Sequence, residues 1–122
     1  ELYPSGTSGG MQKRIAIARA ISMNPEYLFV DEPNSGLDPI TANVIDELIQ
    51  DITIKYNMTT VVVTHDMNSV LEIGDTILFI HEGRAHWYGD KNTILKSDNK
   101  ELNEFVYASE FIRLLRDNIQ KG

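Results

Sequence analysis

The chain of 122 residues has the length of one domain and is short for two. Its 42% hydrophobic and 24% charged residues match the composition of globular proteins and exclude disorder as the default interpretation. The net charge of −7 argues against nucleic-acid binding and direct docking on an anionic membrane, and the absence of cysteine excludes disulfide and thiolate chemistry. No apolar run approaches the ~18–20 residues of a membrane-spanning helix, so we expect no direct membrane insertion.

The first half of the chain alternates helix and strand patterns. Apolar residues at helical spacing predict a helix over residues 9–23. Continuous apolar runs predict strands at 27–30 and 60–64 that are buried on both faces, as in a parallel sheet. Between these strands, Asp38 is the expected N-cap of a helix over residues 39–57. The expected core face of that helix consists of Val44, Ile45, Leu48, Ile49, Ile52 and Tyr56.

The second half of the chain contains a predicted hairpin and further helices. Glu82-Gly83 is a turn signal between two short strands. Strand–helix–strand alternation followed by a hairpin predicts an α/β fold with crossover connections, ending in a β-hairpin and C-terminal helices. The expected elements are a short helix at 67–73, strands at 76–80 and 84–88, and helices at 92–96 and 101–119.

Polar residues directly follow both predicted parallel strands. Asp31 and Glu32 end the first strand and His65 follows the second, at the sheet edge where ligands bind in open α/β folds. One acid can hold a hydrated Mg²⁺ while its neighbour orients or activates a water, and an imidazole can donate a hydrogen bond to a phosphoryl oxygen. The alternative interpretation is structural: the acids cap the next loop and the histidine is an ordinary satisfied side chain. His81 and His86 lack this context and are interpreted as structural.

Two other segments carry candidate binding residues. Ser8, Gly9 and Gly10 stand at the start of the first predicted helix, where backbone N–H groups and the helix dipole can bind an anion. Taken alone, such a sequence is most often a simple loop. Asp38 either only caps the following helix or also belongs to a binding site, and the residues themselves leave both possibilities open.

Four stretches in order, SGGMQKRIAIARAI, YLFVDEP, SGLDP and VVVTHD, resemble the later portion of an ATP-binding cassette (ABC) ATPase. The resemblance extends over nearly the whole chain to about Asp90. It implies a P-loop NTPase-like parallel sheet with flanking helices, of which the N-terminal part is absent from this chain. Residues 1–90 would carry the segment from signature loop to hairpin, and residues 91–122 would form a helical C-terminal extension of the same domain.

The resemblance also implies a role for each matched residue. Glu32 would be the catalytic glutamate that polarises the attacking water, and His65 would contact the γ-phosphate. Asp31 would hold Mg²⁺ through water, and Asp38 would couple the two sites of a dimer. The signature residues, which would bind ATP held by the opposite subunit, are Ser8, Gly9, Gly10 and Met11.

The function implied is that of an ATP-hydrolysing transporter subunit that uses ATP and Mg²⁺. Its partners would be a second copy of the ATPase and membrane permease subunits, with no nucleic acid, and its location the cytoplasmic face of the cell membrane. Met11 and the later segment SDNKELNEFV favour the subgroup linked to lipid trafficking and mammalian-cell-entry-type proteins. The alternatives are the ABC-type ATPases of DNA repair, chromosome maintenance or translation, and a non-enzymatic interaction domain.

Two departures from the family pattern qualify this hypothesis. Thr7 stands where family members commonly carry an aliphatic residue before the signature serine. No G-x-x-x-x-G-K-[ST] phosphate loop occurs in the chain, so we expect the chain alone to bind ATP poorly and not to hydrolyse it. We therefore expect it to be the later part of a longer protein. The apolar stripe of residues 101–119 either packs on the chain's own sheet or contacts a partner.

Overall fold

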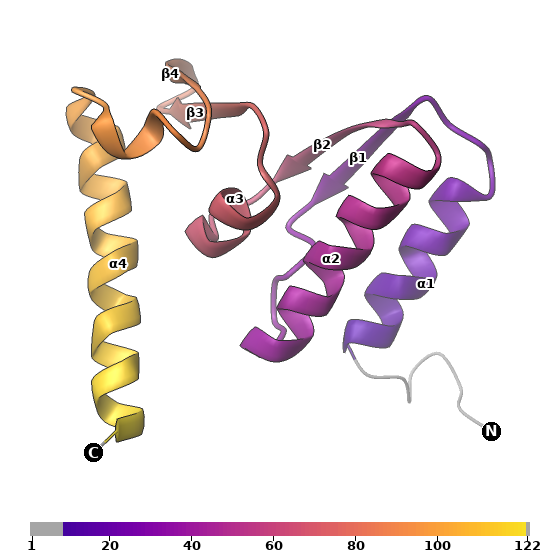
Figure 1. Cartoon of the computed structure of the whole chain (residues 1–122), viewed down its shortest axis with the longest axis horizontal. Coiled ribbons are helices and arrows are strands. Elements are labelled where there is room, and N and C mark those ends of the chain that lie inside the picture. Colours follow the sequence, from indigo (N-terminus) through magenta and orange to yellow (C-terminus); the bar gives the residue numbers. More distant parts are fainter. Residues whose placement is uncertain (1–8, 122) are drawn as a thin grey trace. The chain divides into compact units, whose positions relative to one another are not determined.

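The computed structural model describes residues 9–121, without the side chains of 111–113, 115–117 and 119–121 (Figure 1). The chain divides between His65 and Asp66 into two compact units. The first unit contains α1 (Gly9–Ile21), β1 (Tyr27–Asp31), α2 (Pro39–Lys55) and β2 (Thr59–Val63). The second contains α3 (Met67–Ile73), β3 (Ile77–His81), β4 (Arg84–Gly89), a short 3₁₀ helix η2 (Ile94–Lys96) and α4 (Lys100–Lys121).

The first unit is a strand–helix–strand crossover with one additional helix. β1 and β2 pair in parallel, in a register that runs from Tyr27 opposite Thr59 to Asp31 opposite Val63. The crossover helix α2 and the preceding helix α1 lie side by side in this unit (Figure 1). The parallel pair with its crossover helix confirms the predicted α/β architecture.

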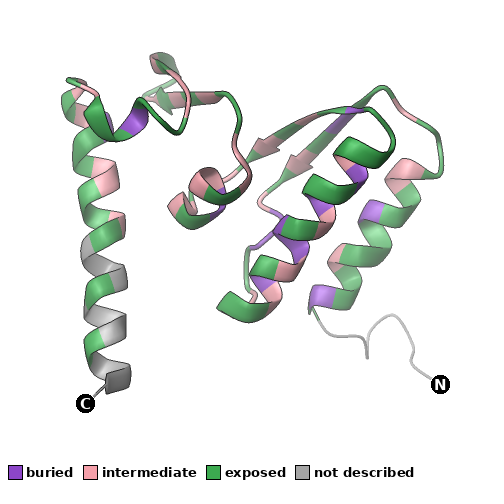
Figure 2. Ribbon diagram, in the orientation of Figure 1, coloured by how far each residue is buried: buried purple, intermediate pink, exposed green. Residues whose placement is uncertain are grey.

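The core of this unit lies between α2 and one face of the two strands. Ile45, Ile49 and Ile52 of α2 are buried, as predicted, and Figure 2 shows several buried positions on this helix. Val44 and Leu48 are half-buried at the margin of the core. The prediction for Tyr56 is wrong, because the helix ends at Lys55 and Tyr56 is its C-cap residue, 48% exposed.

The prediction that both strands are buried on both faces is also wrong for the described structure. Leu28 is buried, whereas Phe29 and Val63 have exposed fractions of 75% and 56%. Side chains of successive strand residues point to opposite faces, and α1 and α2 cover only one of them. The first unit therefore presents an uncovered sheet face that carries apolar side chains.

The second unit is an antiparallel hairpin with the start of α4 packed on it. β3 and β4 pair from Ile77 opposite Gly89 to His81 opposite Arg84, with a register irregularity between Phe79 and Ile80. Glu82 and Gly83 form the predicted turn with φ values of 50° and 72°, the left-handed conformation that hairpin turns use. The hairpin is confirmed.

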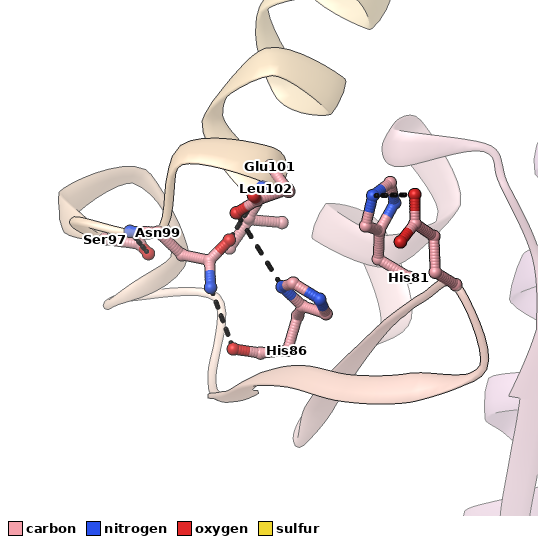
Figure 3. A network of polar contacts seen from close by, with 7 residues as sticks. His81, His86, Ser97, Asn99, Glu101 and Leu102 are labelled. Atoms are coloured by element: carbon pink, nitrogen blue, oxygen red, sulfur yellow. Dashed lines mark hydrogen bonds and ion pairs between the residues drawn. The ribbon is translucent and has the colours of Figure 1, made fainter.

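Asn99 attaches the start of α4 to β4. The side-chain nitrogen of Asn99 donates to the carbonyl oxygen of His86 at 2.8 Å, and its Oδ1 accepts from the Leu102 amide at 3.0 Å (Figure 3). Leu102 is 1% exposed and the ring of Phe105 lies 5.8 Å from that of Phe79. The first turns of α4 therefore pack on the unit's own hairpin.

Two helix predictions in this unit need comment. The helix expected at 92–96 is instead a 3₁₀ turn over Ile94–Lys96, because the Asp90 carboxylate accepts the Asn92 and Thr93 amides and forms a local turn there. The helix expected at 101–119 is α4, longer by a residue or two at each end. Of its predicted apolar stripe, the side chains of Phe111, Ile112, Leu115 and Ile119 lie outside those described. Among the described helices, none is both long and apolar enough to cross a membrane.

Candidate functional site

The candidate site lies at the carboxyl ends of β1 and β2, where the parallel pairing brings two predicted residues together. The Glu32 amide donates to the Val63 carbonyl at 2.7 Å, which extends the ladder by one step beyond β1. Glu32 then turns away from the sheet with φ = 48°. Its Oε1 lies 2.9 Å from Nδ1 of His65, which follows β2. Two residues that are 33 positions apart in sequence thus form one hydrogen-bonded pair, at the sheet edge to which the sequence analysis assigns both of them.

This pair is open to solvent. The side chain of His65 is 77% exposed and that of Glu32 is 35% exposed. Exposed pairs of this kind contribute little to the free energy of folding, because water screens the charges and the side chains lose entropy. The pair therefore has little value as a structural contact, whereas its accessibility suits a site that receives a ligand.

Asp31, the predicted metal-holding residue, is the last residue of β1 and its side chain is exposed. Among the described residues, no group of three or more metal-binding side chains gathers at one place. A single exposed carboxylate is compatible with Mg²⁺, which keeps several waters and takes few protein ligands in nucleotide sites. Asp31 can hold such an ion through water only where a ligand's phosphates supply the remaining oxygens.

Asp38 is the N-cap of α2, as predicted. Its Oδ2 accepts from the Thr41 amide at 3.0 Å, and its Oδ1 accepts from the Thr41 hydroxyl at 2.6 Å. The hydroxyl bond, and after it the amide bond, lowers the pKa of the Asp38 carboxyl below its ordinary value. The capping role is therefore present in the structure, and the role in coupling two sites of a dimer stays a prediction.

The glycines of the predicted anion site have a packing role that the sequence analysis missed. A Cβ atom on Gly10 would lie 2.5 Å from Cγ2 of Thr41, and one on Gly9 would lie 3.0 Å from Cδ2 of Leu37. The start of α1 therefore lies against the start of α2 and the turn before it. Met11 is 42% exposed, and Ser8 lies outside the described residues.

A buried polar pair behind the site was also missed. Nδ2 of Asn34 donates to Oδ1 of Asp46 at 2.8 Å, and the two residues are 9% and 2% exposed. This bond ties the turn after Glu32 to the middle of α2. The signal available in the sequence is that Asp46 lies between Ala42 and Ile49, at helical spacing on the core face.

Lys13 makes a third contact that was not predicted. Its Nζ donates to the backbone oxygen of Glu32 at 3.2 Å and joins α1 to the turn that follows β1.

With this geometry established, comparison with known proteins defines the class. Residues 1–35 match the family described as ABC transporter. Together with the fold, this match makes the chain similar to a segment of an ABC transporter ATPase nucleotide-binding domain. The matched range contains Gly9, Gly10, Asp31 and Glu32.

Individual proteins and solved structures are also similar to this chain. The phosphate import ATP-binding protein PstB 1 of Vibrio vulnificus is 46% identical over 99 residues, which are 81% of this chain and 36% of that protein. The dimeric ATP-binding cassette MJ0796 bound to ADP and Pi is 35% identical, with a TM-score of 0.63 over 72% of this chain and 38% of that one. A transporter described as metal-chelate type and inward-facing is 32% identical, with a TM-score of 0.73 over 81% and 39% of the two chains. The chain thus spans little more than a third of these relatives, and the comparisons give no support to the lipid-trafficking subgroup.

Proposed function

We propose that this chain is the later part of an ATP-binding subunit of an ABC importer, which hydrolyses ATP to drive transport. The observation that carries the proposal is the hydrogen-bonded Glu32–His65 pair at the carboxyl ends of two adjacent parallel strands. A carboxylate held by an imidazole at an open sheet edge is suited to orient and deprotonate a water beside a phosphoryl group. Relatives whose names describe ATP-binding proteins support the same assignment.

Each site residue has a role in this proposal. Glu32 polarises the attacking water, and His65 holds the Glu32 carboxylate and contacts the γ-phosphate. Asp31 is the residue that would hold Mg²⁺ through water, and that ion would neutralise phosphate charge when bound. The signature residues Ser8, Gly9, Gly10 and Met11 bind the nucleotide of a second copy, and Asp38 couples the two sites.

The proposed assembly follows from the absence of a phosphate loop in this chain. Because no G-x-x-x-x-G-K-[ST] motif is present, a nucleotide at Glu32 needs phosphate-binding groups from another part of the protein. We place the working ATPase as a homodimer on the inner face of the cell membrane, bound to permease subunits. The solved cassette MJ0796, described as a dimer, supports the first part of this arrangement.

Phosphate is the transported substrate that the relatives favour. The similar curated proteins, including those of Vibrio cholerae and Pseudoalteromonas translucida, are named as phosphate import proteins. Uptake of radiolabelled phosphate by cells with and without the complete gene tests this substrate. Loss of phosphate uptake on deletion is expected, and unchanged uptake together with altered outer-leaflet lipid composition would support the lipid alternative instead.

Substitution of the proposed catalytic residue tests the enzymatic assignment. In the complete protein that carries this chain, Glu32→Gln is expected to retain ATP binding and to reduce turnover by about a thousandfold, because the amide cannot accept the proton of water. Glu47→Gln, an exposed substitution on α2, is the matched control and is expected to keep full turnover. Turnover of Glu32→Gln at the wild-type rate would contradict the assignment.

The chain by itself provides a second test. Calorimetry of the 122-residue chain with Mg-ATP is expected to show no binding in the micromolar range, because the phosphate loop is absent. Micromolar binding by this chain would overturn the composite-site proposal.

A further inference from the structure

The contact between Lys13 and Glu32 links two parts of the site that are far apart in sequence. Lys13 lies one turn into α1, the helix that begins at Gly9. Its Nζ donates to the backbone oxygen of Glu32 at 3.2 Å, across a separation of 19 residues. The Lys13 side chain is half-buried and, with Asp31 and Pro33, lines a cavity of about 230 Å³ between α1 and β1. It is therefore directed at the turn after β1 and is not an ordinary solvated lysine.

The backbone of Glu32 needs support of this kind. Its φ of 48° lies in the left-handed region, which residues with a Cβ seldom adopt. Such a conformation persists only where surrounding contacts hold it. The Glu32 amide donates to Val63, and its carbonyl accepts from both the Ser35 amide at 3.2 Å and Lys13. Lys13 supplies the only contact among these that comes from α1.

The direction of the Glu32 side chain depends on this backbone conformation. From φ = 48° the carboxylate reaches Nδ1 of His65 at 2.9 Å. The peptide that carries the Glu32 carbonyl can turn only about ψ of Glu32 and φ of Pro33, and the proline ring fixes the second angle. Movement of this carbonyl away from Lys13 is therefore taken up at Glu32 itself and moves its carboxylate relative to His65. The contact from α1 thus acts on the Glu32–His65 pair without touching it.

We infer that Lys13 is a positioning residue, which holds Glu32 in its site conformation and transmits displacement of α1 to the Glu32–His65 pair. The catalytic consequence rests on the proposed function, whereas the conformational link does not. A phosphate-binding role for Lys13 is disfavoured, because its ammonium group is already directed at the Glu32 carbonyl.

The conformational link is tested by NMR on the full 122-residue chain without nucleotide. Lys13→Met keeps the aliphatic stem and removes the donor, and Lys13→Arg restores one. The matched control is Arg19→Met, which removes the same charge from the last turn of α1. We expect Lys13→Met to accelerate amide hydrogen exchange at Ser35 about tenfold or more and to shift the Nδ1 signal of His65. Lys13→Arg is expected to reverse both effects, and Arg19→Met to cause neither.

Unchanged Ser35 exchange and an unchanged His65 signal in Lys13→Met would overturn the inference. If that variant loses the α2 amide signals altogether, Lys13→Gln gives the same comparison, because its polar side chain ends one bond too early to reach Glu32. The inference then requires that Lys13→Gln shifts the His65 signal while the α2 signals stay in place.

Enzyme kinetics of the complete protein distinguish a role of Lys13 in positioning Glu32 from a role in folding alone. Lys13→Met is expected to lower kcat about 10- to 100-fold, as small displacements of catalytic groups do, with an unchanged KM for ATP and with recovery in Lys13→Arg. A normal kcat despite a shifted His65 signal would refute the transmission. If Glu32→Gln also turns over normally, the proposed function fails, and the NMR result still decides whether Lys13 positions Glu32.

Discussion

Substitution of Gly10 by alanine tests how the start of α1 packs. A Cβ on Gly10 would lie 2.5 Å from Cγ2 of Thr41, a distance that folded proteins do not tolerate without movement. Thr41 cannot rotate freely, because its hydroxyl donates to Oδ1 of Asp38 at 2.6 Å and so belongs to the cap of α2. Relief of the clash therefore requires either loss of this hydrogen bond or displacement of α1 from α2.

The expected change in stability on Gly10→Ala follows from two opposing contributions. Overpacking of one methyl group costs about 1–3 kcal/mol, whereas a glycine-to-alanine change in a helix gains up to about 1 kcal/mol and less near the helix start. We expect Gly10→Ala to lower the free energy of unfolding of the first unit by about 1–2 kcal/mol. In a Thr41→Ser background, which removes Cγ2 and keeps the hydroxyl, the same substitution should be neutral or slightly stabilising.

Amide hydrogen exchange measures the change in the free energy of unfolding of the first unit. The amides of Ile45 and Ile49 lie in the buried middle of α2, and their exchange in increasing urea reports opening of the first unit. Gly9→Ala is the comparison, since its Cβ would meet the end of the flexible Leu37 side chain at 3.0 Å and should cost less. Equal destabilisation by Gly10→Ala with Thr41 and with Ser at position 41 would refute the packing argument.

Three further predictions concern other parts of the chain. Asn34→Ala is expected to lower stability by about 2 kcal/mol in urea unfolding, because it removes a donor to the buried Asp46 carboxyl; a loss below about 0.5 kcal/mol would contradict a structural role. Leu102→Ala is expected to lower the free energy of unfolding of the second unit by about 2–5 kcal/mol. Fluorescence of Trp87, the single tryptophan, follows the unfolding of this unit, and an unchanged unfolding midpoint would contradict the packing of α4. The lowered pKa of Asp38 means that its ionised cap stabilises the fold above the unfolded-state value of 3.8 and loses this contribution as pH falls through the lower folded-state pKa. Asp38→Asn should therefore flatten the acid limb of a stability–pH curve below pH 3.8, and an identical acid limb would contradict the assignment.

Features set by local sequence were predicted well. The helix at 67–73 has the predicted bounds, and Asp38 caps α2, because helix starts depend on residues within one turn. The location of Glu32 and His65 at one sheet edge was also predicted, although the hydrogen bond between them was not. This location follows from topology, since parallel strands place their carboxyl ends at one edge of a sheet.

Features set by contacts between distant elements were not predicted. The approach of Gly10 to Thr41, the Asn34–Asp46 pair and the Lys13–Glu32 bond all depend on how α1 and α2 cross the sheet. Hydrophobic periodicity states which face of a helix is buried but contains no information about crossing angle or depth. Glycine in particular has two interpretations, an exposed backbone for a ligand and a close helix contact, and only the structure shows the second.

The strand prediction failed in a way that carries information about the whole protein. Phe29 and Val63 point to the uncovered face of the two-stranded sheet. In a sheet that is covered on one side only, the residues on the open face are usually polar. The sequence of both strands is therefore suited to burial on two sides, although α1 and α2 bury only one. This agrees with relatives of which the chain spans 36%. The candidate site shows a similar pattern, because the Glu32–His65 pair is open to solvent and the chain contains no G-x-x-x-x-G-K-[ST] phosphate loop. The uncovered apolar face and the open Glu32–His65 pair thus both support the proposal that residues outside this chain complete the sheet and the site.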